Sequence, residues 1–521
     1  MKNLGVLLVA VAGVMATSAV GCGSTADTEP APGPVAIEAA TPTAPPLAEE
    51  IAVDQVAVYQ GVKATLVQEG AIVAAPNAPV IANRPAFVRV FVKAIGRTRP
   101  LLEAELHVKR AGKEDLVLKD GGKRMLPELD EELLENTFNF TIPAEAMTTD
   151  ASFSFKVGAT GTATSVAYPA DGTAQRFDAK ATSPKVRVKL VPVSYEVDGV
   201  SLTPDLADLT VYKDTLYKMY PTASIEMSVR TPHVWTNAIK ANGSGWSDLL
   251  ASIVQERKND KPERDVYYIG VFTPQASIDE FCASGGCVLG LAPLANEREV
   301  GLRAAIILGY KNRGSANTMA HELAHAMGRG HAPCGSPDGV DDDFPYGSAS
   351  IGVWGYDILA SKLINPGNRY RDFMSYCGPN WVSDYTYKAL FERMDIVTKQ
   401  QAAVDTATPA TGSSGTPGQR PSTELRQSFR VDPDGSVHEG PAIEVLPGQD
   451  QGETVLVSYE GALGKVFATA KGRVRHLSEE SAGSFILAPQ APIGATRARI
   501  STVGARSARS VVELGARAFA R

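Results

Sequence analysis

The chain of 521 residues lacks an excess of basic side chains, a long apolar run and any repeat of solenoid length. It has 51 Lys and Arg against 58 Asp and Glu, a net charge of -7, so its charge gives no reason to expect nucleic acid as a partner. The apolar N-terminal run, residues 4–16, is too short to span a membrane. The chain is too long for one core, and its length suggests about three domains.

Histidine is also scarce, yet three of the seven histidines lie between positions 321 and 331. His321, Glu322, His325, Gly328 and His331 form the pattern H-E-x-x-H-x-x-G-x-x-H. Two histidines four residues apart on a helix share one face, so both imidazoles can bind a single zinc ion. A glycine can end the helix through a positive φ and bring the third histidine round as a ligand. The full pattern is too specific to be explained by three incidental histidines on a helix.

The same pattern assigns a role to Glu322. A site with three protein ligands keeps its fourth position for water, as catalytic zinc sites do. Glu322 is not needed as a ligand, and its carboxylate is placed to accept a proton from the zinc-activated water as a general base.

These residues carry a family resemblance. The extended motif resembles the metzincin clan of zinc metallopeptidases, which also have a methionine turn downstream of the motif. Residues 372–377, DFMSYC, fit that turn, with Met374 as its methionine. Tyr376 is similar to the tyrosine of the astacin and serralysin branches, and the resemblance implies that it stabilises the oxyanion. It also implies an α/β metzincin-like catalytic domain over residues 185–400.

The N-terminus reads as a sorting signal. Lys2, the apolar run and small residues leading into Cys22 resemble a bacterial lipobox, so residues 1–22 are expected to be a signal peptide with Cys22 as its lipidated residue. A plain secretory signal that leaves a free thiol is the alternative. The first interpretation predicts an exported lipoprotein on a periplasm-facing membrane or the cell surface. Residues 23–50, rich in Pro, Ala and Thr, are expected to be a disordered tether.

Four cysteines remain after Cys22, and export favours disulfides over metal binding. Three pairings are possible in principle. We predict Cys282–Cys287 and Cys334–Cys377, because the second bond would tie the segment after the third histidine to the methionine turn. Their spacing does not resemble a zinc ribbon.

The flanking regions are predicted to be β-structured. Residues 51–181 alternate apolar and polar side chains and are expected to form a β-sandwich that acts as a spacer, a substrate-binding module or a cover. No cysteine in this region could bind the zinc. Residues 402–421 read as a linker, and residues 422–521 as a small C-terminal β-domain.

Within residues 185–400, alternating strands and helices predict an α/β unit. Residues 287–293 are expected to be an antiparallel edge strand that binds an extended peptide. Ser315 or Asn317 is expected to cap the zinc-binding helix, and Ser383 a later one. The acidic residues Asp338, Asp341, Asp342 and Asp343 lack EF-hand spacing and favour a solvated loop, with calcium or basic substrate side chains as the alternatives.

The function predicted from the sequence is that of a zinc-dependent endopeptidase acting on extracellular or periplasmic proteins. One alternative is a non-catalytic, surface-anchored binding protein that retains the zinc site. The other is a zinc hydrolase acting on a non-peptide bond. The sequence indicates neither the substrate nor the oligomeric state.

Overall fold

The computed structural model describes residues 46–180, 184–283, 285–310, 312–407, 422–461, 463–502 and 510–515. The predicted signal peptide, its Cys22, residues 23–45 of the tether and residues 408–421 of the linker lie outside these ranges. The last residues of the predicted tether include a short helix, α1 (Leu47–Glu50). Within the described ranges, no helix is long and apolar enough to cross a membrane.

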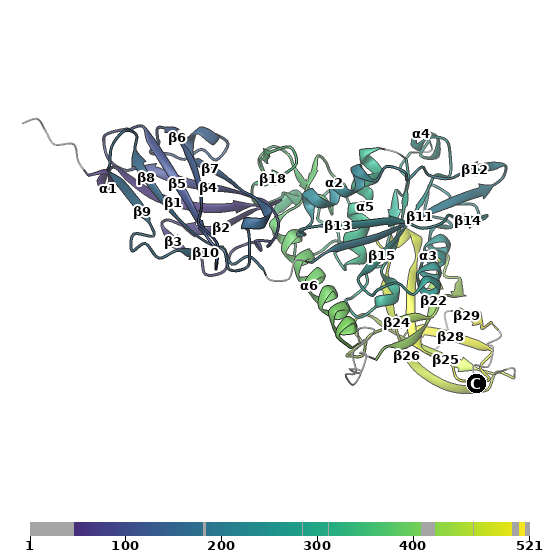
Figure 1. The fold of residues 1–521 in the computed structure, drawn as a ribbon. Helices are drawn as coiled ribbons and strands as arrows, with labels where there is room; N and C mark the ends of the chain where they lie inside the picture. Colours follow the sequence, from purple (N-terminus) through teal and green to yellow (C-terminus); the bar gives the residue numbers. More distant parts are fainter. Residues whose placement is uncertain are drawn as a thin grey trace, which may run out of the picture. The chain divides into compact units, whose positions relative to one another are not determined.

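The N-terminal region is a sandwich of two five-stranded sheets (Figure 1). The first has the order β3-β2-β1-β4-β7 and consists of β1 (Ile51–Tyr59), β2 (Lys63–Gln68), β3 (Ala71–Ile72), β4 (Ala86–Ala94) and β7 (Phe138–Ile142). The second has the order β10-β8-β5-β6, with β9 beside β8, and consists of β5 (Leu102–Lys109), β6 (Leu116–Lys123), β8 (Ser152–Ala159), β9 (Ser165–Tyr168) and β10 (Gln175–Arg176). Every second residue of β5 is buried, as the sequence alternation predicts.

The central region is built on a mixed sheet. Its strands β11 (Val186–Val197), β15 (Val266–Phe272) and β17 (Ala304–Leu308) are parallel, and β16 (Gly290–Leu291) lies antiparallel at the edge beside β17. Besides β15, three further strands pair with β11: β12 (Val200–Leu202), β13 (Ile225–Val229) and β14 (His233–Trp235). The antiparallel edge strand predicted within residues 287–293 is therefore present.

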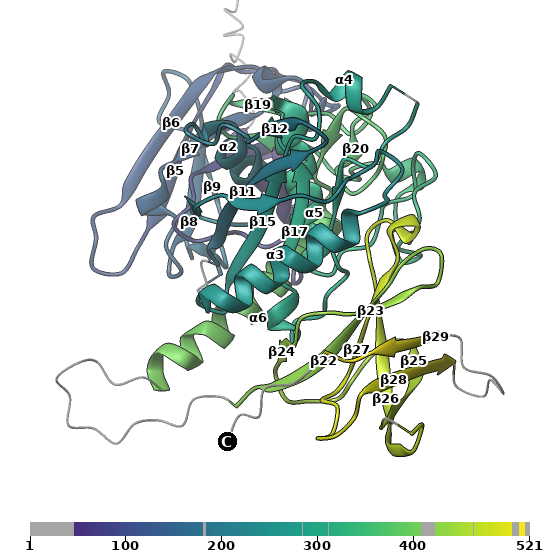
Figure 2. The same cartoon turned by 90° about the vertical axis from the view of Figure 1, so that its right-hand side faces the viewer.

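Helices cover both faces of this sheet. The helices are α2 (Thr210–Met219), α3 (Trp246–Asp260), α4 (Ile278–Phe281), α5 (Arg313–Ala326) and α6 (Asp384–Ala407). Tyr268 and Phe272 of β15 share a core with α3, which crosses β15 and β17 in Figure 2. Ile269 and Val271 point to the opposite face and share a core with α2 and α5. Because both faces are covered, β15 and β17 are buried along their whole length.

Two small pairs of strands follow α5: β18 (Gly355–Asp357) with β19 (Lys362–Ile364), and β20 (Arg371–Asp372) with β21 (Asn380–Trp381). The helix α6 then begins after Ser383, whose hydroxyl accepts from Thr386 N at 3.1 Å, so the predicted cap is correct. The helix continues to Ala407, beyond the expected end of this region at residue 400.

The C-terminal region is an antiparallel sheet with the order β23-β22-β27-β26-β25-β28-β29, and β24 beside β22. Its strands are β22 (Glu424–Val431), β23 (Val437–Glu439), β24 (Ile443–Val445), β25 (Thr454–Glu460), β26 (Val466–His476), β27 (Ser484–Pro489), β28 (Arg497–Thr502) and β29 (Ser510–Glu513). The sheet nearly closes on itself, since Gly515 N after β29 donates to Glu439 of β23 at 2.7 Å. A multidomain, mostly β chain is thus confirmed.

The sandwich is joined to the central region by buried polar contacts. The guanidinium of Arg84, 0% exposed, donates to the carbonyls of Tyr217, Tyr220 and Thr222 at 2.6–2.7 Å. The hydroxyl of Tyr387 in α6 donates to Gln60 O at 3.0 Å. The two regions also share one hydrophobic core cluster, which makes the sandwich part of the scaffold around the central sheet.

Candidate active site

The helix α5 carries the first two histidines of the motif, and its N-cap is Asn312. The Asn312 side chain accepts from Ser315 N at 2.9 Å. The prediction of Ser315 or Asn317 as the cap was wrong, because the helix begins earlier and Ser315 supplies the N–H that is capped.

The helix ends as the sequence predicts. Gly328 has φ +84°, and its N–H donates to His325 O at 2.7 Å, which closes the last turn. The chain then reverses towards His331, whose N–H donates to Gly339 O at 3.1 Å. Asp341 N donates to His331 O at 2.8 Å, so residues 339–341 hold the third histidine.

The three histidines of the motif converge on one point. The separations of their Nε2 atoms are 2.9 Å between His321 and His325, 3.0 Å between His325 and His331, and 3.2 Å between His331 and His321. This is a group of three possible metal ligands within the described part of the chain.

The Nδ1 atom of each ring faces a backbone carbonyl. The distances are 2.7 Å from His321 Nδ1 to Phe373 O, 2.6 Å from His325 Nδ1 to Arg329 O, and 2.5 Å from His331 Nδ1 to Asp338 O. A carbonyl only accepts, so each neutral imidazole carries its proton on Nδ1 and presents the Nε2 lone pair to the shared centre.

Three lone pairs that face one another need a cation between them. Burial lowers the pKa of all three histidines, that of His321 to about 3, so the rings are neutral as metal ligation requires. The backbone carbonyls that face Nδ1 fix the ring orientations in the way usual for metal-binding histidines. The residues therefore fit a divalent metal ion.

The turn at residues 372–377 is fastened to this centre. Ala332 N donates to Met374 O at 2.9 Å, and Tyr376 N donates to Cys334 O at 3.0 Å. The buried Asp372 accepts from Met374 N at 2.8 Å. Met374 is 1% exposed within the main hydrophobic core.

Both predicted disulfides are present, Cys282–Cys287 and Cys334–Cys377. The second bond joins the segment after His331 to the turn, whose Phe373 carbonyl orients His321.

The acidic loop before the turn has a structural role that the sequence did not indicate. Asp341 pairs with Arg329 at 2.7 Å and accepts from Tyr385 at 3.0 Å, while the backbone of Asp338 orients His331. This part of the loop supports the third histidine.

Glu322 is 4% exposed and lies beside the histidine centre. A Cβ on Gly290 of β16 would come within 2.4 Å of Glu322 Cγ and 2.6 Å of Oε1, so only glycine leaves room for this side chain. Burial raises the pKa of the Glu322 carboxyl well above its usual range, the charge of Glu479 adds to this, and a hydrogen bond from Ser478 acts in the opposite direction.

Tyr376 lies next to two of the histidines. Its ring centroid is 4.9 Å from that of His331 and 6.2 Å from that of His321. Its hydroxyl donates to Glu479, and burial raises the pKa of the phenol. The phenol is therefore protonated and can donate a hydrogen bond.

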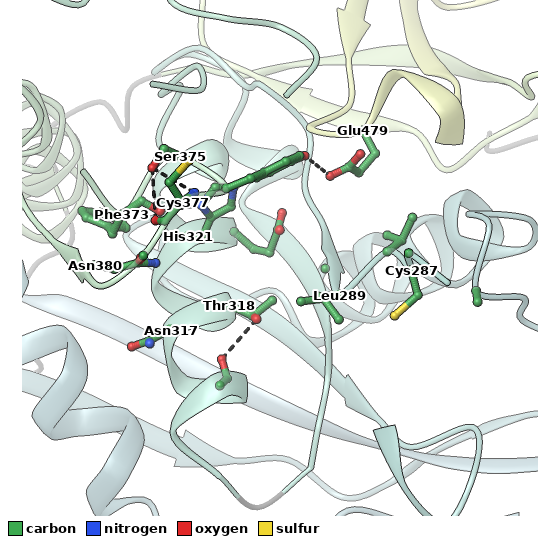
Figure 3. A pocket seen from close by; sticks show the side chains of 18 of the residues that line it. Cys287, Leu289, Asn317, Thr318, His321, Phe373, Ser375, Cys377, Asn380 and Glu479 are labelled. Atoms are coloured by element: carbon green, nitrogen blue, oxygen red, sulfur yellow. Dashed lines mark hydrogen bonds between the residues drawn. The ribbon is translucent and has the colours of Figure 1, made fainter. Parts of the chain in front are cut away.

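A cavity of about 550 Å³ opens onto His321, Glu322 and Tyr376. One wall is the segment from Val288 to Gly290, and the opposite wall is the turn that includes Ser375. Glu479 projects into the same space from the C-terminal sheet (Figure 3). None of its described lining residues belongs to the N-terminal sandwich.

No sequence pattern predicts the residues that the C-terminal region adds to the site. Ser478 Oγ donates to Glu322 Oε2 at 3.1 Å across a separation of 156 residues, and no spacing rule links two such positions. The part played by Gly290 was also missed, since its closeness to Glu322 depends on the packing of β16 on α5.

The edge strand is partly covered. Val288 N donates to Ala241 O at 2.9 Å, and Ser478 N donates to Ala292 O at 2.8 Å. The backbone around Gly290 lies between these two contacts, at the wall of the cavity.

Residues 305–403 match a family model described as Peptidase M66. The match covers most of β17, all of α5, the three histidines, the turn and most of α6. It supports a metallopeptidase, and thereby a chain that acts on proteins or peptides. No curated protein matches the chain.

Proposed function

We propose that this chain is a zinc-dependent endopeptidase of the metzincin type. The observation that carries the proposal is the convergence of three oriented Nε2 lone pairs next to Glu322, at the wall of an open cavity. His321, His325 and His331 would hold the ion. A bound zinc ion supplies a Lewis acid that polarises the peptide carbonyl and makes water acidic enough to react near neutral pH.

Glu322 acts as the general base and then as the general acid. A divalent cation held by the three histidines would favour the ionised form of this buried carboxyl. The carboxylate takes the proton of the attacking water and delivers it to the amine that leaves. The Gly290 backbone and Ser478 restrict the carboxylate on two sides, so it reaches the reacting atoms with little freedom to reorient.

Tyr376 donates a hydrogen bond to the oxyanion of the tetrahedral intermediate. The proximity of its ring to His331 and its protonated phenol support this role. To reach the oxyanion, the phenol gives up its contact with Glu479. Met374 would form the apolar floor below the metal site.

The substrate binds as an extended peptide along the segment from Val288 to Gly290, which lines the cavity at the edge of the central sheet. The chain is exported and held to a membrane through a lipid on Cys22, on the periplasm-facing side or the cell surface. The two disulfides support export, since such bonds persist in oxidising compartments.

The decisive experiment compares wild type with Glu322→Gln. Both purified proteins are incubated with a denatured protein mixture, with and without a zinc chelator, and new termini are identified by mass spectrometry. We expect chelator-sensitive cleavage by wild type and a loss of about 10²–10⁴-fold in Glu322→Gln at unchanged zinc content. Glu392→Gln, the same change on the exposed side of α6, is the matched control.

Cleavage by Glu322→Gln at the wild-type rate would refute the mechanism. A zinc-loaded wild-type protein that produces no new termini would instead favour the surface-anchored binding protein or the hydrolase of a non-peptide bond.

A further inference from the structure

A connecting segment of the C-terminal sheet lies at the candidate active site. This segment, residues 477–483, joins β26 to β27. Leu477 forms an antiparallel bridge with Pro293, Leu294 N donates to His476 O at 2.9 Å, and Ser478 N donates to Ala292 O at 2.8 Å. The segment therefore extends the edge of the central sheet next to Gly290.

The position of the Ser478 hydroxyl is fixed. Ser478 is 3% exposed, and its Oγ accepts from Ala292 N at 3.0 Å. A hydroxyl has one proton to donate, and here it points to Glu322 Oε2 at 3.1 Å. The backbone of the edge strand thus sets the direction in which Ser478 donates.

The next residue contacts the other proposed catalytic group. Glu479 accepts a hydrogen bond from the Tyr376 hydroxyl, and its side chain reaches into the cavity in Figure 3. Two successive residues of the C-terminal sheet thus contact Glu322 and Tyr376.

Buried hydrophobic side chains hold the segment and the strand that follows it against the central region. Leu477, Phe485 and Leu487 share a hydrophobic cluster with α3 and with Ile306 of β17. The ion pair of Arg475 in β26 and Glu299 is also buried, with both side chains less than 10% exposed. This packing holds Ser478 in place as part of the folded protein.

We propose that Ser478 is a positioning residue for Glu322, so that the C-terminal sheet completes the active site of the peptidase. The inference rests on the proposed function, and it assigns to the C-terminal region a role in catalysis. With Oε2 held by Ser478, Oε1 lies next to Gly290, and the carboxylate keeps one orientation through the catalytic cycle.

The test uses the full chain and a peptide that spans a cleavage site found for wild type. We expect Ser478→Ala to lower kcat by about 10- to 100-fold, as the loss of a hydrogen bond to a charged group implies. KM, zinc content and Tm should stay close to wild type. Ser478→Thr retains the hydroxyl and should recover most of kcat. Ser458→Ala, the same change on β25, is the control.

Three outcomes would overturn the inference. The first is a wild-type kcat in Ser478→Ala, and the second is a raised kcat, which would mean that the segment restrains the site. The third is a rise in KM or a fall in zinc content that accounts for the whole loss of activity. If Ser478→Ala does not fold, Ser478→Cys, which keeps the side-chain size, should show the same fall in kcat. A zinc-loaded wild type that cleaves no substrate refutes the proposed function and this inference together. An active wild type whose kcat is unchanged in Ser478→Ala refutes this inference alone.

Discussion

Replacing Gly290 by alanine tests whether the edge strand sets the position of Glu322. The added Cβ would lie 2.4 Å from Glu322 Cγ, 2.6 Å from Oε1 and 2.7 Å from Cδ. Ordinary van der Waals contact begins near 3.4 Å, so the side chain or the strand must move by about 1 Å. The strand β16 is held by its pairing with β17 and by its packing on α5. The Glu322 carboxylate therefore moves more easily than the strand backbone.

A displacement of about 1 Å in a catalytic group can lower the rate about 10²-fold. We therefore expect Gly290→Ala to lose roughly two orders of magnitude in kcat, because the carboxylate leaves both its place beside the reacting atoms and its bond with Ser478. The three atoms nearest to this Cβ all belong to Glu322 and none to a histidine, so we expect the zinc content to stay unchanged.

The assay is cleavage of the same peptide by protein of equal zinc content, with thermal unfolding to verify the fold. Gly347→Ala is the matched control, since a Cβ on Gly347 meets no atom within 4 Å. A wild-type kcat in Gly290→Ala would refute the placement of Glu322 against the edge strand. Loss of zinc in this variant would show that the strand acts on the metal site instead.

Two further predictions concern the stability of the site. Replacing Cys334 and Cys377 together by serine opens a loop of sequence separation 43 and should lower the free energy of unfolding by about 4 kcal/mol, against about 2 kcal/mol for Cys282 and Cys287 with separation 5. Only the replacement of Cys334 and Cys377 should also weaken zinc binding, measured in a competition assay with a chromogenic chelator. Equal losses of zinc affinity in the two double variants would contradict this. Zinc at 1,000 times its Kd should stabilise the protein by about 4 kcal/mol, and His331→Ala should abolish the gain. A Tm that zinc does not raise in wild type would exclude a metal site at the three histidines.

Features that depend on neighbouring residues could be predicted from the sequence. The spacing of His321 and His325 follows from the period of one helix, and the need for a positive φ at Gly328 follows from the missing side chain. Strand positions in the sandwich could be predicted because apolar and polar residues alternate there with a period of two. The disulfide between Cys334 and Cys377 was predicted among three possible pairings because it would tie the segment after the third histidine to the methionine turn, and the structure contains it.

Smaller local details were harder to predict. Asn312, rather than Ser315 or Asn317, caps α5, because both Asn and Ser can cap a helix and only the path of the preceding chain decides which residue does. The acidic loop gave no sign that Asp341 would pair with Arg329, since the same composition is typical of solvated loops.

By itself, the sequence determined the metal-binding pattern, the glutamate within it and the strand content of the flanking regions, because each depends on backbone geometry over a few residues. Only the tertiary structure decided that the sandwich joins the scaffold through Arg84, that Gly290 makes room for Glu322, and that Ser478 reaches the same carboxylate. Contacts across such distances along the chain are selected by the summed packing of whole sheets and helices, to which no single residue pattern corresponds.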